Sequence, residues 1–403
     1  MLAKKYLILT TQENSFLNDI GNGYNREFLK NGAIYIDYND LYTKNGNKKT
    51  EELIEDIIKQ NGIEVLIYHS EPSVFHFTPE FFQSLQKRVF TVMMLGDTIH
   101  YFDERDIYYA QCMDLVIVYD CLSRYRFQQY GVDAISFYSS YDKNKYFKIN
   151  DMGKSINVSF VGDIAHKTDR KAYIDYMIKN GIAIEVFGTG SKNGQVTLDQ
   201  MVEIFNKTKV NLNFTGLSSK TSIKKELNIN HRLTQMKGRI AEIALCGGFV
   251  LSEYVPGIEE VFDINKEIVI FRNKEEMIEK IKYYLQYEDE REAIAKNGYV
   301  RALKDYGIST AIPKLINRIE EIRRSKIEKL SEVYLDSHFV KNYVTFRVKM
   351  VAIFIKARKW NLLFEEMWII LKKKKINVKN AIRFLLAGLF PSLKKLYLRL
   401  TLK

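Results

Sequence analysis

The stretch MKGRIAEIALCGGFVLSEYVPGIEEVF (236–262) indicates the fold, because it joins a helix to a buried strand through a pair of glycines. Lys237-Gly238-Arg239 opens an apolar helix, which ends at Gly247-Gly248. The run FVLSEY that follows is apolar and of strand length, and a Pro-Gly loop ends it. A helix that leads directly into a buried strand is the repeating unit of a parallel α/β sheet.

The same alternation of apolar strands and helices extends in both directions from this stretch. Downstream lie EIVIF (267–271) and the amphipathic run EEMIEKIKYYLQ (275–286). Upstream lie INVSFVGD (156–163), IAIEVFGTG (182–190) and VNLNFTG (210–216), with helical runs between them. We therefore predict a doubly wound, Rossmann-like domain over residues 151–330.

A second series of strand-length apolar runs precedes residue 150. These runs are KYLILTT (5–11), AIYIDYND (33–40), IEVLIYHS (63–70), FTVMMLGD (90–97) and MDLVIVYD (113–120). They predict another Rossmann-like domain over residues 1–150, and the polar, turn-rich run 139–155 predicts a hinge. The predicted fold class is thus α/β, with two doubly wound domains that face each other across a cleft. Ligands of such sheets bind beyond the carboxyl ends of the strands.

The net charge of +12 is confined to residues 331–403. This tail holds 16 Lys and Arg against 4 Asp and Glu, whereas the preceding 330 residues hold 45 of each. We predict three basic, amphipathic helical pieces at about 340–358, 360–374 and 379–400. Trp, Phe and Leu beside lysine runs suit a helix that lies on an anionic membrane surface, so a cytoplasmic protein at the inner face of the cell membrane is expected. Packing of the tail on the body or on another subunit is the alternative.

Segregated positive charge argues against a nucleic-acid partner, which would favour basic residues along a binding face. The three cysteines lie in apolar runs and are expected to be free core residues in a reducing compartment. The histidines are scattered without the spacing of metal ligands, so no metal site is expected.

The start of the helix at Lys237 has the chemistry of an anion site. Exposed N–H groups and the helix dipole favour a negative charge there, and Lys237 and Arg239 add two cations. Gly238 would let a phosphate approach the backbone closely. Glu242, one turn further on, would accept hydrogen bonds from a ribose.

This segment resembles the C-terminal half of the GT-B glycosyltransferases of the group-1 type, especially the branch named after the CgeB spore-maturation protein. The features that carry the resemblance are the K-G-R-x-x-E helix, the Gly-Gly turn, the strand end Glu253-Tyr254 and the loop PGIEEVF (256–262). The runs EIVIFRNKEEMIEKIKYYL and DEREAIAKNGYVRAL extend it downstream. The likeness is good over residues 156–310 and loose before them.

The resemblance implies transfer of a sugar from a nucleotide-diphosphate donor, bound by the second domain, without a metal cofactor. The acceptor, a polysaccharide, a lipid-linked glycan or a protein, would face the first domain. The implied donor-binding residues are Gly162, Arg170, Gly188, Gly190, Lys237, Gly238, Arg239, Glu242, Tyr254 and Gly257. Gly21 and Gly23 would face the acceptor.

Asp97 and His100 follow a buried strand and are the candidate catalytic groups, because both could orient an acceptor hydroxyl and Asp97 could serve as a general base. The alternative is a turn capped by Asp97 beside a solvated His100. The sequence departs from the family pattern at Thr234, where many group-1 enzymes have a glutamate that touches the donor sugar. Thr234 therefore supports a non-catalytic binding scaffold as one alternative. A nucleotide-sugar epimerase, which shares the architecture, is another, although a soluble substrate would not need the basic tail.

Overall fold

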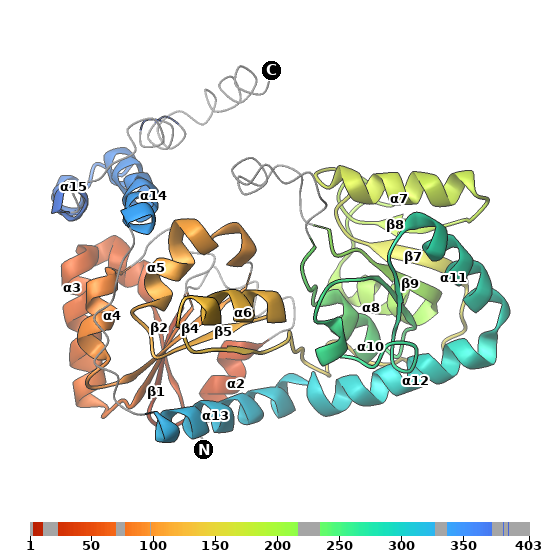
Figure 1. The fold of residues 1–403 in the computed structure, drawn as a ribbon, viewed down its shortest axis with the longest axis horizontal. Helices are drawn as coiled ribbons and strands as arrows, with labels where there is room; N and C mark the ends of the chain where they lie inside the picture. Colours follow the sequence, from red (N-terminus) through yellow and green to blue (C-terminus); the bar gives the residue numbers. More distant parts are fainter. Residues whose placement is uncertain are drawn as a thin grey trace.

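The computed structural model describes residues 3–10, 23–69, 77–96, 98–216, 234–326 and 337–372, together with Ile382 and Leu386. Within these residues two parallel sheets lie side by side, each between layers of helices (Figure 1). The predicted α/β class with two Rossmann-like domains is confirmed.

The first sheet is parallel throughout and has the strand order β2-β1-β3-β4-β5-β6. Its strands are β1 (Tyr6–Thr10), β2 (Ile34–Asp37), β3 (Val65–His69), β4 (Phe90–Leu95), β5 (Leu115–Val118) and β6 (Ala134–Ser136). The helical elements between them are α2 (Tyr24–Lys30), α3 (Tyr38–Gln60), α4 (Pro79–Leu85), η2 (Thr98–His100), η3 (Phe102–Asp106), α5 (Ile107–Ala110) and α6 (Cys121–Gln129).

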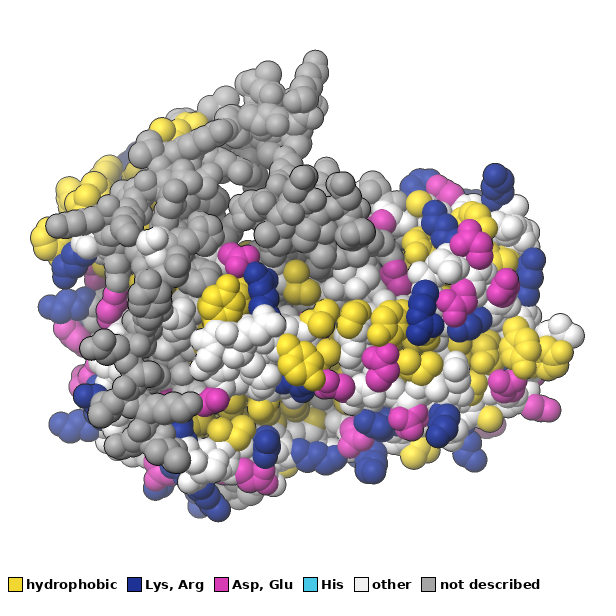
Figure 2. Space-filling model, in the orientation of Figure 1, with side chains coloured by type: hydrophobic (Ala, Val, Ile, Leu, Met, Phe, Trp, Pro, Cys, Tyr) yellow, Lys and Arg dark blue, Asp and Glu magenta, His cyan; other side chains and the backbone are white. Residues whose placement is uncertain are grey.

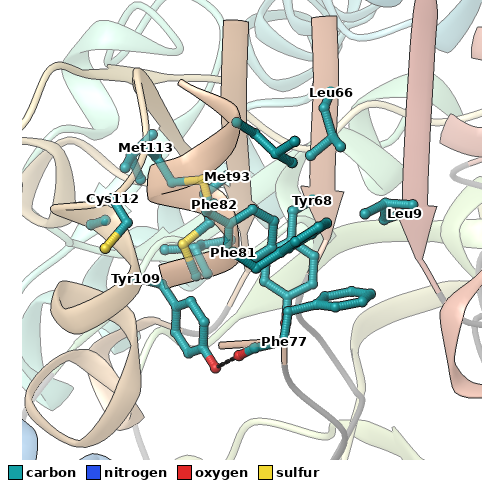
Figure 3. Packing of buried hydrophobic residues seen from close by; sticks show 14 of the residues in the cluster. Leu9, Leu66, Tyr68, Phe77, Phe81, Phe82, Met93, Tyr109, Cys112 and Met113 are labelled. Atoms are coloured by element: carbon teal, nitrogen blue, oxygen red, sulfur yellow. Dashed lines mark hydrogen bonds between the residues drawn. The ribbon is translucent and has the colours of Figure 1, made fainter. Parts of the chain in front are cut away.

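Both faces of this sheet are apolar, since successive strand residues point to opposite sides. Leu7 and Leu9 of β1 pack under α3, α4 and α5, whereas Tyr6 and Ile8 pack on the other face. On the first face an aromatic cluster fixes α4 against β3. Its ring pairs include Tyr68 with Phe82, whose centroids are 4.8 Å apart (Figure 3). Continuous apolar runs therefore predict these strands correctly.

The second sheet is also parallel and has the order β11-β10-β9-β7-β8. Its strands are β7 (Ile156–Val161), β8 (Glu185–Phe187), β9 (Thr208–Asn213), β10 (Val250–Glu253) and β11 (Val269–Phe271). Its helices are α7 (Thr168–Lys179), α8 (Leu198–Lys207), α10 (Arg239–Leu245), η4 (Ile258–Glu260), α11 (Lys274–Gln286) and α12 (Glu288–Asp305). In each sheet the strand order reverses between the first and third strands, β1 and β3 or β7 and β9, which is where ligands of doubly wound sheets bind.

The chain passes between the domains twice, once after β6 and once between α12 and α13 (Ile308–Ser325). The two crossing segments pair with each other, because Tyr141 N donates to Tyr306 O and Ile308 N donates to Tyr141 O, each at 2.9 Å. Beyond this point α13 runs under the first sheet and covers the face that carries Tyr6 and Ile8 (Figure 1). One face of the first domain is therefore completed by residues that follow the second domain in sequence.

The tail helices α14 (Ser337–Lys356) and α15 (Trp360–Lys372) form a hairpin on the first domain (Figure 1). Arg347 and Glu366 are both buried and pair at 2.8 Å, and the Tyr42 hydroxyl of α3 donates to the same carboxylate. Packing on the body, the alternative weighed for the tail, thus applies to one face of residues 337–372. The predicted helical piece 379–400 lies outside the described residues except for Ile382 and Leu386.

Helix α15 packs against α3 at a kink in α3. At Gly46 the backbone takes φ 77°, and the N–H of Asn47 donates to Glu365 at 3.1 Å. A Cβ at Gly46 would lie 2.3 Å from the Glu365 carboxylate, so glycine is required both by the conformation and by this close approach. Among the described helices, none is long and apolar enough to cross a lipid bilayer.

We predict that Arg347→Ala or Glu366→Ala alone loosens the α14–α15 hairpin, because each leaves a buried charge without its partner. The expected cost is about 3–5 kcal/mol. Hydrogen exchange followed by mass spectrometry should show faster exchange in α15. The double variant Arg347→Met/Glu366→Leu, which replaces the pair with apolar groups, should recover most of the protection. Unchanged exchange in both single variants would mean that the hairpin is not docked through this pair.

Candidate functional site

Two glycine loops meet at the carboxyl ends of β7 and β8. Gly162 follows β7, and Gly188 and Gly190 follow β8 with φ of +111° and +86°. Gly162 N donates to Phe187 O at 2.8 Å, and a Cβ at Gly188 would lie 2.4 Å from Gly162 O. The structure therefore brings the loops of Gly162 and Gly188 together, and the backbone of Gly162 leaves no room for a side chain at Gly188. A Cβ at Gly190 would lie 2.7 Å from the Ala165 Cβ.

Arg170 supports the first of these loops. Its guanidinium is largely buried, donates to Asp163 O at 3.2 Å and lies 5.5 Å from the ring centre of Phe160. The Asp163 carboxylate accepts from the N–H groups of Ala165 and His166 at 2.9 and 3.0 Å. Partial burial opposes ionisation, but the hydrogen bonds from His166 hold the pKa of Asp163 below its usual value. The turn is thus held by hydrogen bonds to an Asp163 carboxylate whose ionised form is favoured.

Hydrogen bonds connect the carboxyl ends of β9 and β10 in front of the segment that leads into α10. Glu253 is buried and accepts from the N–H and hydroxyl of Thr215 at 2.8 and 3.0 Å. The next residues form a β-bridge between Gly216 and Thr234, and Gln235 N donates to Thr215 O at 3.0 Å. Thr234, the position that departs from the family pattern, therefore closes the base of the loop that joins β9 to α10.

The start of α10 lies against the first crossing segment. The Tyr138 hydroxyl donates to Lys237 O at 2.6 Å, and a Cβ at Gly238 would lie 1.8 Å from the Tyr141 hydroxyl oxygen. The missing side chain of Gly238 thus makes room for Tyr141. This corrects the expectation that a phosphate would use that space.

Arg239 and Glu242 form an ion pair with each other on one side of α10. The Arg239 guanidinium lies 5.5 Å from the ring centre of Phe205 in α8, and Glu242 is buried. Burial, and next the charge of Glu242, raise the pKa of Tyr141 well above its usual value. Glu242 is therefore not an ordinary exposed helix residue, and it faces the crossing segment between the domains. Arg239 occupies one of the two oxygens of this carboxylate, Oε2.

The loop after β10 forms a second contact between the domains. Gly257 has φ +91°, and a Cβ there would lie 2.0 Å from the Cys121 sulfur at the start of α6. Glu260 pairs with Arg124 of α6 at 3.0 Å. Tyr254, directly after β10, shares a side-chain hydrogen bond with Glu259 of this loop, and the Arg272 guanidinium lies 4.9 Å from its ring centre.

A pocket of ≈ 250 Å³ lies between the domains beside this contact. Its lining includes Asp120, Cys121, Tyr138, Met236, Gly257 and Tyr306. Of the predicted donor-binding residues, Gly257 reaches this pocket, whereas the glycine loops and the Arg239–Glu242 pair belong to separate groups of contacts. The cysteines Cys112, Cys121 and Cys246 are free and buried, as expected.

The predicted acceptor side can be followed only in part. Gly21 and Asp97 lie outside the described residues. Gly23 precedes α2 with φ +52°, and His100 ends η2, with its side chain outside the described part. Their assigned roles remain predictions.

Sequence reasoning missed a polar group at the edge of the first sheet where the carboxyl ends of its strands lie. His69 ends β3, and burial, with a smaller effect from the charge of Arg105, lowers its pKa to about 4. Arg105 pairs with Asp106 at 2.6 Å, and the Thr98 hydroxyl donates to Asp106 at 2.7 Å. The available signal for His69 was its position directly after the apolar run VLIY (65–68). In the described part of the chain, no three His, Cys, Asp or Glu residues are placed to hold a metal ion.

We predict that Gly257→Ala destabilises the protein by about 2–4 kcal/mol, because the new methyl group must displace Cys121 and take an unfavourable φ. Gly131→Ala is the matched control, since Gly131 also has positive φ (+74°) but open space around it. The control should cost only about 1–2 kcal/mol. Thermal unfolding of the two variants checks the difference, and equal losses would contradict the contact between the loop and α6.

We predict that His69 makes the protein acid-sensitive in a defined window. Its ordinary pKa is about 6.5, so above that pH it is neutral in both the folded and unfolded chains. As the pH falls from about 6.5 to 4, only the unfolded chain gains the proton, so up to about 3 kcal/mol of stability is lost. His69→Asn should flatten the pH dependence of the unfolding free energy in this window, relative to the wild type. Parallel curves for the two proteins would show that folding does not lower the pKa of His69.

Part of the chain matches a known protein family. A family model described as "Glycosyl transferase-like" matches residues 170–317, which run from α7 into α13. No curated protein sequence matches the chain.

Several solved structures are similar in fold. One is HepE from Anabaena in complex with UDP, with a TM-score of 0.54, 14% identity, and coverage of 79% of this chain and 100% of that one. A glycosyltransferase from Rickettsia africae has a TM-score of 0.53, 12% identity and coverage of 80% and 100%. Sucrose-phosphate synthase from Thermosynechococcus elongatus has a TM-score of 0.55, 9% identity and coverage of 80% and 99%. Because identities this low show the fold alone, we conclude that the chain has the two-domain GT-B fold.

Proposed function

We propose that the protein is a glycosyltransferase that moves a sugar from a nucleotide-diphosphate donor to a glycan, lipid-linked or protein acceptor. The observation that carries this proposal is the match of residues 170–317 to the glycosyl transferase-like family model. The matched range holds Lys237, Glu242 and Gly257, together with the ends of β9, β10 and β11.

A uridine diphosphate sugar is the proposed donor, since HepE, which shares the fold, has been solved with UDP and with UDP-glucose. We place it at the carboxyl ends of β7 and β9, the switch point of the second sheet. Lys237 and Arg239 would offset the negative charge of the diphosphate. Arg239 would turn from Glu242 to the phosphates, which frees that carboxylate to accept hydrogen bonds from the ribose.

The proposed reaction joins an acceptor oxygen to the anomeric carbon of the sugar and breaks the bond from that carbon to the diphosphate. The acceptor hydroxyl loses its proton, for which Asp97 and His100 are the proposed acceptors. Negative charge grows on the leaving diphosphate, and cationic side chains in a fixed geometry stabilise it without a metal. The motif at 237–262 supports membership of the CgeB-like branch as part of this proposal. The basic tail supports a bacterial protein at the cytoplasmic face of the cell membrane, with an acceptor that is close to the membrane and belongs to a surface glycan.

A thermal-shift titration tests donor binding. At a ligand concentration of about 100 times Kd, a ligand of the native state adds about 2.7 kcal/mol of stability, so UDP or a UDP-sugar should raise the melting temperature by several degrees. Glu242→Gln should weaken UDP binding at least about tenfold, because an amide replaces the charged acceptor. Glu279→Gln, on the exposed face of α11, is the matched control and should bind like the wild type.

Two results would count against parts of this account. Wild-type affinity in Glu242→Gln would remove Glu242 from the donor site and leave the proposed function standing. No shift with any nucleoside diphosphate or nucleotide sugar would contradict the proposed function itself.

A further inference from the structure

The outward face of α15 carries a continuous apolar stripe. Trp360, Phe364, Met367, Trp368 and Leu371 recur at helical spacing, and each is between 41% and 64% exposed. In Figure 2 hydrophobic side chains gather at the upper left edge of the molecule, where Figure 1 places α15. Both tryptophans of the chain belong to this stripe.

The opposite face of α15 packs against α14 and α3. Leu363 and Ile370 pack with Val348 and Phe354 of α14. Glu366 is buried in its pair with Arg347, and Glu365 accepts from the backbone at the kink of α3. The helix is therefore held rigidly with its apolar stripe outward, and both of its acidic residues are turned away from that stripe.

The surroundings of the stripe are basic. Between residues 356 and 372 the other exposed side chains include Lys356, Arg358 and Lys372 and no acidic residue. The Lys372 ammonium lies 5.6 Å from the Trp368 ring, and the sequence continues with three further lysines. Exposed Trp and Phe with a basic rim complement an anionic lipid surface, where apolar rings enter the headgroup layer and lysines meet the phosphates.

We propose that this stripe, Trp360, Phe364, Met367, Trp368 and Leu371, is a docking surface for an anionic lipid bilayer. A second copy of the chain is disfavoured as the occupant, since a two-fold contact would set the basic rim against itself. The surface belongs to the first domain, because α14 lies along η3 and α5, which follow β4. If the proposed function holds, docking thus places the membrane beside the acceptor domain, and the acceptor is membrane-borne.

Intrinsic fluorescence gives a selective test with the full chain, because its only tryptophans lie in the stripe. With vesicles of phosphatidylcholine and phosphatidylglycerol we expect a blue shift of tryptophan emission and co-sedimentation. Vesicles of phosphatidylcholine alone should bind more weakly, and added salt should weaken binding to the anionic ones.

The variant Phe364→Ser/Leu371→Ser keeps both tryptophans and changes only exposed side chains. It should melt like the wild type and bind anionic vesicles at least about tenfold more weakly. The matched control Leu29→Ser/Val300→Ser removes two apolar side chains exposed on α2 and α12 and should bind like the wild type.

Three results would overturn the proposal: no binding to anionic vesicles, wild-type binding by Phe364→Ser/Leu371→Ser, or a dimer by light scattering with emission already blue-shifted without lipid. Titration with UDP in solution is independent of this test. A protein that binds UDP but no vesicles refutes the docking surface alone, and one that binds vesicles but no nucleotide refutes the proposed function alone.

Discussion

Two hydrogen bonds at Tyr141 hold together the two places where the chain crosses between the domains. The need for this pairing follows from the first sheet, which is parallel and must be covered on both faces. Helices α3, α4 and α5 cover one face, but α2 leaves part of the other open, and α13 completes it. Since α13 follows the second domain in sequence, the chain has to return, and it returns beside its first crossing.

Tyr141 also connects this crossing to the proposed donor site. Its side chain fills the space beside Gly238, and the charge of Glu242 contributes to its raised pKa. A rotation of one domain against the other therefore changes the surroundings of Glu242. The contact between Gly257 and Cys121 restrains the same rotation from the other side of the pocket. If the donor binds at Glu242 as proposed, donor binding and domain orientation are coupled through these few residues.

Apolar runs of strand length were enough to predict most strands of both sheets, because a strand buried on both faces leaves a continuous hydrophobic signal. β6 (Ala134–Ser136) was missed, since Asp133 and Ser136 interrupt its apolar pattern. The kink at Gly46 and the burial of Glu366 depend on side chains about 320 residues apart, so local sequence could not reveal them. A carboxylate and a guanidinium in a basic tail look like solvated groups until their partners are known.

In the candidate site, too, some features could be predicted from the sequence and others could not. Gly162 and Gly188, picked out by the resemblance, lie in contact because they follow the adjacent parallel strands β7 and β8, while their proposed role toward a donor remains a prediction. Gly238 was identified for a phosphate but serves Tyr141, a contact that only the tertiary structure defines. His69 was overlooked because its burial, rather than any motif, gives it an unusual pKa.

The central claim is that this chain catalyses sugar transfer rather than only binding or interconverting a nucleotide sugar. The most direct measurement is the release of UDP from a panel of UDP-sugars by the full chain, with and without a bacterial membrane extract as acceptor. We expect UDP release that depends on the extract and incorporation of the labelled sugar into it. Tight binding of a nucleotide sugar without any transfer, or conversion of one free nucleotide sugar into its epimer, would contradict the account.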